Sequence, residues 1–206
     1  MPTSWAMPDP GRTPSFPQLE AVEHALAAPA PARPHGLRLK HALDRVGALV
    51  ALVLALPVLA VAAAVAKLAS SESVLVRERR IARDGSSFRM LAFAPVPVLR
   101  RFSVDQLPQL VNVLKGEMSF VGPRPERPDF VELFGANLRR HDQPRRVRPG
   151  VTGWSQLKEL DGPAPLADRV RWDDWYVENW SLRLDLKIAL MTVRDVWRGV
   201  AAASDG

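Results

Sequence analysis

The chain has 206 residues, and 47% of them are hydrophobic, which suits one catalytic-sized domain with a tail. It contains no cysteine, so disulfide bonds and thiolate metal sites are excluded. The formal net charge of +6 indicates anionic partners, and the phosphates of a membrane surface, a nucleotide sugar or a nucleic acid would each satisfy it.

The N-terminal segment, residues 1–37, is rich in proline and alanine and has little to bury, so we expect a disordered tail there. A short helix over residues 18–28 is compatible with its composition. The segment is not a secretory signal, because the apolar run comes late and lacks a cleavage pattern. At the opposite end we expect residues 200–206 to form a flexible C-terminus.

Residues 46–66 carry no charge over about 20 positions, the length at which a helix crosses a bilayer. Two arrangements fit: a helix broken near Pro57 that enters one leaflet and returns, or a kinked helix that spans the membrane. Cations flank both ends, and basic residues prefer the cytoplasmic side, so both ends are expected to be cytoplasmic. These cations are Arg38, Lys40, Arg45, Lys67, Arg77, Arg79, Arg80 and Arg83.

A β-hairpin is predicted over residues 77–91, because Asp84-Gly85 is a hairpin-type turn between two segments with alternating apolar positions.

The next segment, residues 103–125, combines a helix start with a rigid turn. Ser103 can cap a helix, and Gln106 stands three residues on, as a reciprocal cap requires. Asp105 then lies in a first helical turn, where free N–H groups favour an ionised carboxylate and a nearby phosphate. Pro108 also suits a helix start. The alternative is an ordinary amphipathic helix in which Asp105 is merely a surface residue.

The segment ends in the sequence Gly122-Pro123-Arg124-Pro125. Its two prolines fix φ, so this turn is expected to hold the Arg124 guanidinium in one direction, which suits a phosphate.

Three blocks in order give the chain a family resemblance. They are SVDQLPQLVNVLKGEMSFVGPRP over residues 103–125, VRPGVTGWSQ over 147–156, and YVENWSL followed by DLK over 176–187. With the apolar segment ahead of them, they resemble the bacterial sugar transferases that act as monotopic phosphoglycosyltransferases. The resemblance covers residues 38–199.

The resemblance implies an α-rich α+β fold. A re-entrant helix-break-helix would lie in the membrane at about residues 46–66, and residues 72–199 would form a small cytoplasmic catalytic part of helices with a short β-hairpin. The chain would then act at the cytoplasmic face of the cell inner membrane. Membrane lipids are implied partners, and downstream glycosyltransferases are possible ones. Nucleic acid is not expected, because the sequence contains no nucleic-acid-binding module.

The resemblance also implies a reaction, the first membrane step of exopolysaccharide or glycoconjugate assembly. Asp105 attacks the β-phosphate of a UDP-sugar, UMP leaves, and a polyprenyl (undecaprenyl) phosphate accepts the sugar phosphate from the aspartyl intermediate. Covalent catalysis by a carboxylate is chemically reasonable. Asp105 and Gln106 are the implied catalytic pair, and Arg100, Arg124 and Arg148 the implied phosphate-binding residues.

Three departures from the family pattern surround this implied site. Gln106 replaces a glutamate that helps to hold Mg²⁺ in the family, and its neutral amide is a weaker metal ligand than a carboxylate. Glu117 stands about three helical turns away and is a poor substitute. A basic motif and a loop are also missing between Leu91 and Arg100. The alternative is therefore a catalytically weakened member that binds lipid phosphate or a partner protein at the membrane.

Overall fold

A computed structural model describes the chain apart from residues 1–33, 71–72, 83–85, 129–146, 160–165 and 205–206. The short helix expected at 18–28 and the Asp84-Gly85 turn lie outside the described residues. The described part is rich in helices and has two small two-stranded sheets, so the expected α-rich α+β class is confirmed.

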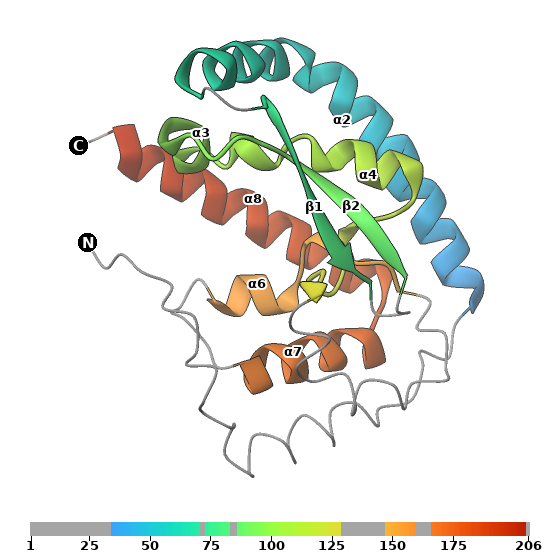
Figure 1. The fold of residues 1–206 in the computed structure, drawn as a ribbon. Coiled ribbons are helices and arrows are strands. Elements are labelled where there is room, and N and C mark those ends of the chain that lie inside the picture. The colour runs from blue at the N-terminus through green and yellow to red at the C-terminus, as the bar shows by residue number, and fades with distance from the viewer. Residues whose placement is uncertain (1–33, 71–72, 83–85, 129–146, 160–165, 205–206) are drawn as a thin grey trace, which may run out of the picture.

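Helix α2 (Pro34–Ala69) contains the apolar segment and begins before the expected domain boundary at residue 38. Pro57 lies inside α2 and does not interrupt it, so the re-entrant form expected from a break near Pro57 stays a prediction. A proline costs a helix one backbone hydrogen bond and bends it, but need not end it. Figure 1 shows that α2 changes direction, with its blue half along one side of the molecule and its teal half arching over α3 and α4.

The predicted hairpin is confirmed and is slightly longer than expected. Strand β1 (Leu75–Ile81) pairs antiparallel with β2 (Ser87–Phe93), with Leu75 opposite Phe93 at one end and Ile81 opposite Ser87 at the other. Short helical elements follow: α3 (Pro97–Arg101), the 3₁₀ turn η1 (Val104–Gln106) and α4 (Gln109–Lys115).

The expected cap at Ser103 is wrong. Ser103 has a left-handed backbone with φ of 55° and makes no side-chain capping bond. Asp105 therefore lies in a separate 3₁₀ turn, which the Leu107 N–H closes by donating to the Val104 carbonyl at 3.2 Å. The helix proper begins at Gln109, directly after Pro108, which agrees with the expectation that Pro108 suits a helix start.

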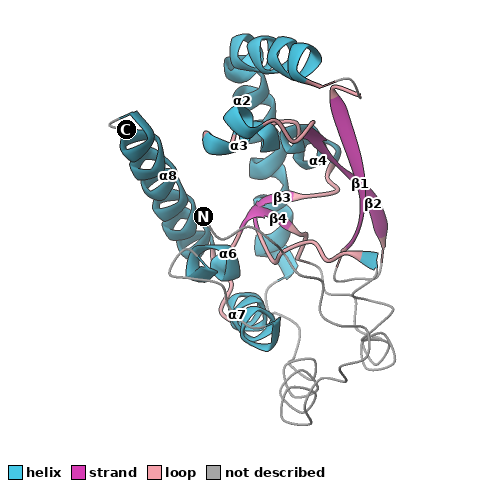
Figure 2. Cartoon of the chain, turned by 60° about the vertical axis from the view of Figure 1, so that its left-hand side comes forward, coloured by secondary structure: helices cyan, strands magenta, loops and turns pink. Residues whose placement is uncertain are grey.

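The second sheet lies at the centre of the described part. Strand β3 (Ser119–Val121) runs parallel to β4 (Gly150–Thr152), and Figure 2 shows this pair between the hairpin and α8. Three helices complete the fold: α6 (Trp154–Glu159), α7 (Leu166–Glu178) and α8 (Leu182–Ser204), the last of which continues past the expected boundary at residue 199.

Both ends of α2 pack against the same folded domain. Near its start, Leu37 joins a buried cluster with Tyr176 and Ile188 from α7 and α8. Near its end, Ala62 and Ala66 join a second buried cluster, which also contains Phe93, Ala94, Val96 and Leu99. The middle of the helix is left largely exposed, with only 11% of its most apolar window buried.

Candidate functional site

Asp105 and Arg100 are brought together by the short elements before α4. The Ser103 N–H donates to the Arg100 carbonyl at 3.1 Å, which ends α3 and turns the chain back through the left-handed Ser103. The Asp105 carboxyl is half-buried, and its Oδ1 has no hydrogen-bond partner among the described residues. A buried carboxylate oxygen without a donor is costly, so the site is suited to reaction or to a ligand rather than to stability.

Burial raises the pKa of Asp105 above its ordinary value of 3.8. The backbone N–H groups of Asp105 and Gln106 and the positive charge of Arg100 act in the opposite direction. These groups favour the ionised form, which is the nucleophilic form of a carboxyl group. The sequence placed Arg100 near Asp105, and the structure agrees.

Gln106 is exposed at the end of the 3₁₀ turn, next to Asp105. Glu117 lies at the other end of α4, where its Oε2 accepts a hydrogen bond from Asn112 Nδ2 at 2.6 Å. Within the described ranges no three acidic or histidine side chains gather closely enough to hold a metal ion. The donors beside Asp105 therefore fit a protein-held Mg²⁺ poorly, since such sites use one or two carboxylates as well as substrate phosphates.

The turn at residues 122–125 is anchored on both sides. A side chain at Gly122 would collide with the backbone of Arg148 and Gly150, so only glycine fits there. Pro123 is fully buried, Pro125 is buried, and the Pro123 carbonyl accepts a bond from the Gly150 N–H at 2.9 Å.

Arg124 itself is exposed, and its backbone N–H donates to Asp173 Oδ2 at 3.0 Å. Next to the turn, Glu126 pairs with Ile81, the last residue of β1. Val104, beside Asp105, packs against the buried cluster that contains Phe93, at the opposite end of the hairpin. The turn at residues 122–125 and the 3₁₀ turn η1 thus lie at opposite ends of the hairpin. Phosphate binding by Arg100 and Arg124 stays a prediction.

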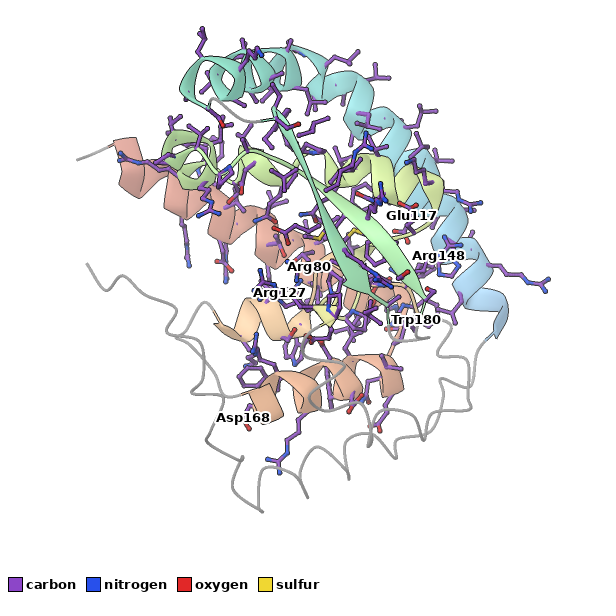
Figure 3. All side chains as sticks on the ribbon, viewed as in Figure 1. Arg80, Glu117, Arg127, Arg148, Asp168 and Trp180 are labelled. Atoms are coloured by element: carbon purple, nitrogen blue, oxygen red, sulfur yellow. The ribbon has the colours of Figure 1, made fainter. Side chains whose placement is uncertain are left out.

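Arg148 lies in a different environment from Arg100. Its guanidinium and that of Arg45 from α2 converge on Gly116, the residue at the C-terminal end of α4. Burial, followed by the nearby charge of Arg45, lowers the pKa of Arg148 from its ordinary value. Figure 3 shows Arg148 and Glu117 on the α2 side of the molecule.

Asn112 is a positioning residue that the sequence did not reveal. It is fully buried on α4, where its Oδ1 accepts from the Leu91 N–H at 3.0 Å and its Nδ2 donates to the Arg89 carbonyl at 2.7 Å. These bonds fix the hairpin against the helix that follows Asp105. An asparagine amid the apolar positions of an amphipathic helix is the signal that could have indicated it.

A buried polar network at the start of α2 was also missed. Lys40 Nζ lies 2.7 Å from Asp185 Oδ2, and Asp44 Oδ2 accepts from Ser119 Oγ at 2.6 Å. The Tyr176 hydroxyl donates to Asp185 Oδ1 at 2.6 Å. Burial and then the Asp185 carboxylate raise the pKa of Tyr176, so its hydroxyl remains a donor. Lys40 is therefore a structural residue rather than a flanking cation available to lipid.

The chain matches the family model described as bacterial sugar transferase over residues 35–97 and 94–199. It is 33% identical over 199 residues to the exopolysaccharide production protein ExoY of Rhizobium meliloti, with 78% of this chain and 86% of the relative covered.

Two longer relatives have names that state a reaction. The UDP-N-acetylgalactosamine-undecaprenyl-phosphate N-acetylgalactosaminephosphotransferase of Aeromonas hydrophila is 31% identical over 191 residues, covering 80% of this chain and 45% of that protein. The UDP-glucose:undecaprenyl-phosphate glucose-1-phosphate transferase of Escherichia coli is 34% identical over 182 residues, covering 75% of this chain and 39% of that protein. The chain thus spans less than half of either relative.

Proposed function

The chain belongs to the bacterial sugar transferase family, and we propose that it transfers a sugar phosphate from a UDP-sugar to undecaprenyl phosphate in exopolysaccharide or glycoconjugate assembly. The observation that carries the proposal is the half-buried carboxyl of Asp105, which has a free Oδ1 and the charge of Arg100 beside it. The names of the Aeromonas and Escherichia relatives supply the substrate classes.

Two displacements at phosphorus make up the proposed reaction. A carboxylate oxygen of Asp105 bonds to the β-phosphorus of the UDP-sugar, and the bond to the bridging oxygen breaks, so that UMP leaves with the electron pair. An oxygen of undecaprenyl phosphate then attacks the same phosphorus and releases Asp105 as a carboxylate. Arg100 offsets the negative charge of the phosphates, a role that oriented cations fill in phosphoryl transfer.

Mg²⁺ stays an expectation from the family resemblance. When bound, the ion would neutralise diphosphate oxygens, and Gln106 could offer it one amide oxygen. Because no group of three potential metal ligands gathers among the described residues, no step of the proposed reaction is routed through the metal.

The packing of α2 supports a re-entrant membrane helix on the cytoplasmic face of the inner membrane. A straight helix of 36 residues is about 54 Å long, enough to put its ends on opposite sides of a bilayer. Here Leu37 near the start and Ala66 near the end both pack against one domain, while Leu54 in the middle is 73% exposed. An exposed apolar surface of this extent suits lipid.

Helix α8 supports the same location. Its exposed apolar side chains recur at helical spacing and form one stripe, flanked along one edge by cations, as in helices that lie in a membrane interface. The stripe consists of Leu182, Leu186, Leu190, Val193 and Trp197, and the cations are Arg183, Lys187, Arg194 and Arg198.

The test is release of UMP by the purified full chain with undecaprenyl phosphate and a panel of UDP-sugars. We expect release with at least one donor, and none from Asp105→Ala. Absence of release across a broad panel would overturn the proposal and favour a catalytically weakened lipid-phosphate or partner-binding protein. Gln106→Glu is the companion variant: it should strengthen the response to Mg²⁺ if the second carboxylate is what the site lacks.

A further inference from the structure

Arg45 and Arg148 form a cluster of positive charge at the C-terminal end of α4. An atom placed where Gly116 lacks a Cβ would lie 2.5 Å from Arg45 Nη2 and 3.0 Å from Arg148 Nη1. The two guanidinium groups therefore face the same small space. Arg148 Nη1 is buried, and neither it nor the buried His41 Nε2 has a hydrogen-bond partner among the described residues.

The nearby acids all have other bonding partners. Asp44 is the acid whose charge acts on Arg148, but its Oδ2 accepts from Ser119 and lies 3.7 Å from Lys40 Nζ. Asp185 is also bonded to Lys40. Both acids are thus shared with Lys40, and the carboxylate of Glu117, next to Gly116, accepts a bond from Asn112.

Backbone donors already bond two of the carbonyls at the end of α4. The Val113 carbonyl accepts from the Gly116 N–H at 2.9 Å, and the Asn112 carbonyl accepts from the N–H groups of Glu117 and Met118 at 2.9 and 3.2 Å. These carbonyls are therefore occupied by backbone donors. The exposed Arg45 and the partly buried Arg148 bring two like charges together, so this arrangement favours an anionic ligand.

The apolar surface beside Arg45 indicates what the anion is attached to. Leu49 and Leu56 follow Arg45 at spacings of four and eleven residues, which places all three on one face of the helix. Leu49 is 53% exposed and Leu56 is 59% exposed. A bound anion would thus sit where the charged start of α2 meets its uncharged segment, with an apolar track leading away from it.

We propose that Arg45 and Arg148 bind the phosphate of a membrane lipid, with an acyl chain of that lipid along Leu49 and Leu56. The site lies at the opposite end of α4 from Asp105, about 10 Å along a helix of seven residues. The proposal rests on the membrane location of α2 but not on catalysis. Planar guanidinium groups match phosphate oxygens through paired, charge-assisted hydrogen bonds.

The test is native mass spectrometry of the purified full chain in detergent with phosphatidic acid, with diacylglycerol of the same acyl chains, and with inorganic phosphate. We expect retention of phosphatidic acid alone. Arg45→Gln and Arg148→Gln should each weaken retention about tenfold, the effect of losing one charge-assisted hydrogen bond. The control is Arg79→Gln, which removes an equal charge from an exposed position on β1.

Thermal melting without lipid separates binding from folding. Arg45→Gln should melt no lower than the wild type, because the substitution removes a repulsion. Phosphatidic acid should raise the melting temperature of the wild type and not that of the variant. Equal retention by Arg45→Gln, an equal loss in Arg79→Gln, or equal stabilisation by diacylglycerol or inorganic phosphate would each overturn the proposal. None of these readouts depends on UMP release.

Discussion

Lys40 Nζ and Asp185 Oδ2 lie 2.7 Å apart and join the start of α2 to α8 across 145 positions of sequence. Both residues are buried, and Asp185 also accepts bonds from the Tyr176 hydroxyl at 2.6 Å and from Trp180 Nε1 at 3.1 Å. The apolar segment therefore leaves the folded domain from a point fixed by a buried ion pair.

Lys40→Met should destabilise the protein by about 3–5 kcal/mol, because it leaves the buried carboxylates of Asp44 and Asp185 without their cation. Urea unfolding in mild detergent measures the change. Lys67→Met, an exposed lysine on the same helix, is the control and should change stability by less than about 0.5 kcal/mol. Equal effects of the two substitutions would contradict a structural role for the pair.

Asn112→Leu should cost about 3 kcal/mol or more. Leucine has a similar volume but leaves the Leu91 N–H, the Arg89 carbonyl and the Glu117 carboxylate without the bonds that Asn112 makes. Asn179→Leu, at an exposed position whose side-chain amide donates to the Trp175 carbonyl, should cost less than about 1 kcal/mol. The same unfolding assay compares the two variants. If Asn112→Leu does not change the free energy of unfolding, the hairpin is held by other contacts.

The topology of α2 can be measured directly, because the chain has no cysteine of its own. Single cysteines at Arg38 and Lys67, both exposed, mark the two ends of the helix. For a re-entrant helix, a membrane-impermeant maleimide should label neither position in intact spheroplasts and both in inverted vesicles. Labelling of one end from each side would instead identify a helix that spans the membrane.

Local patterns predicted the elements whose causes are local. The hairpin follows from alternating apolar positions on either side of a turn, and α2 from a long uncharged run. The expected cap at Ser103 failed because a serine with a glutamine three residues on also fits a left-handed residue before a 3₁₀ turn. The amino-acid sequence alone does not distinguish a capped helix start from a left-handed residue before a 3₁₀ turn.

Long-range contacts account for most of what the sequence left open in the site. In the sequence, Lys40 is one of several cations beside the apolar segment. Only the fold shows that it pairs with Asp185. Arg45 and Arg148 are far apart in the chain, and only the fold brings both to Gly116. Arg100 was within reach of sequence reasoning because it lies in the short helix α3, only five residues before Asp105.

The acidic limb of the pH–rate profile should lie above the ordinary aspartate pKa of 3.8, because burial raises the pKa of Asp105 and the attacking form is the carboxylate. Arg100→Gln removes a charge that lowers this pKa, so the limb should move to still higher pH. The rate should also fall by about 10²–10³-fold through lost stabilisation of charge. Arg101→Gln is the control, since its charge is not among those that shift Asp105. If the acidic limb of Arg100→Gln stays at the wild-type pH, the charge of Arg100 does not act on the pKa of Asp105, and the prediction is wrong.

The central claim is that Asp105 forms a covalent bond to the sugar phosphate. Intact-mass analysis of the purified chain, incubated with UDP-sugars in the absence of undecaprenyl phosphate, measures this most directly. We predict that the mass increases by one sugar phosphate with release of one UMP, that peptide mapping places the adduct on Asp105, and that Asp105→Asn forms none. An adduct on another residue, or no adduct with a donor that the enzyme turns over, would contradict the account.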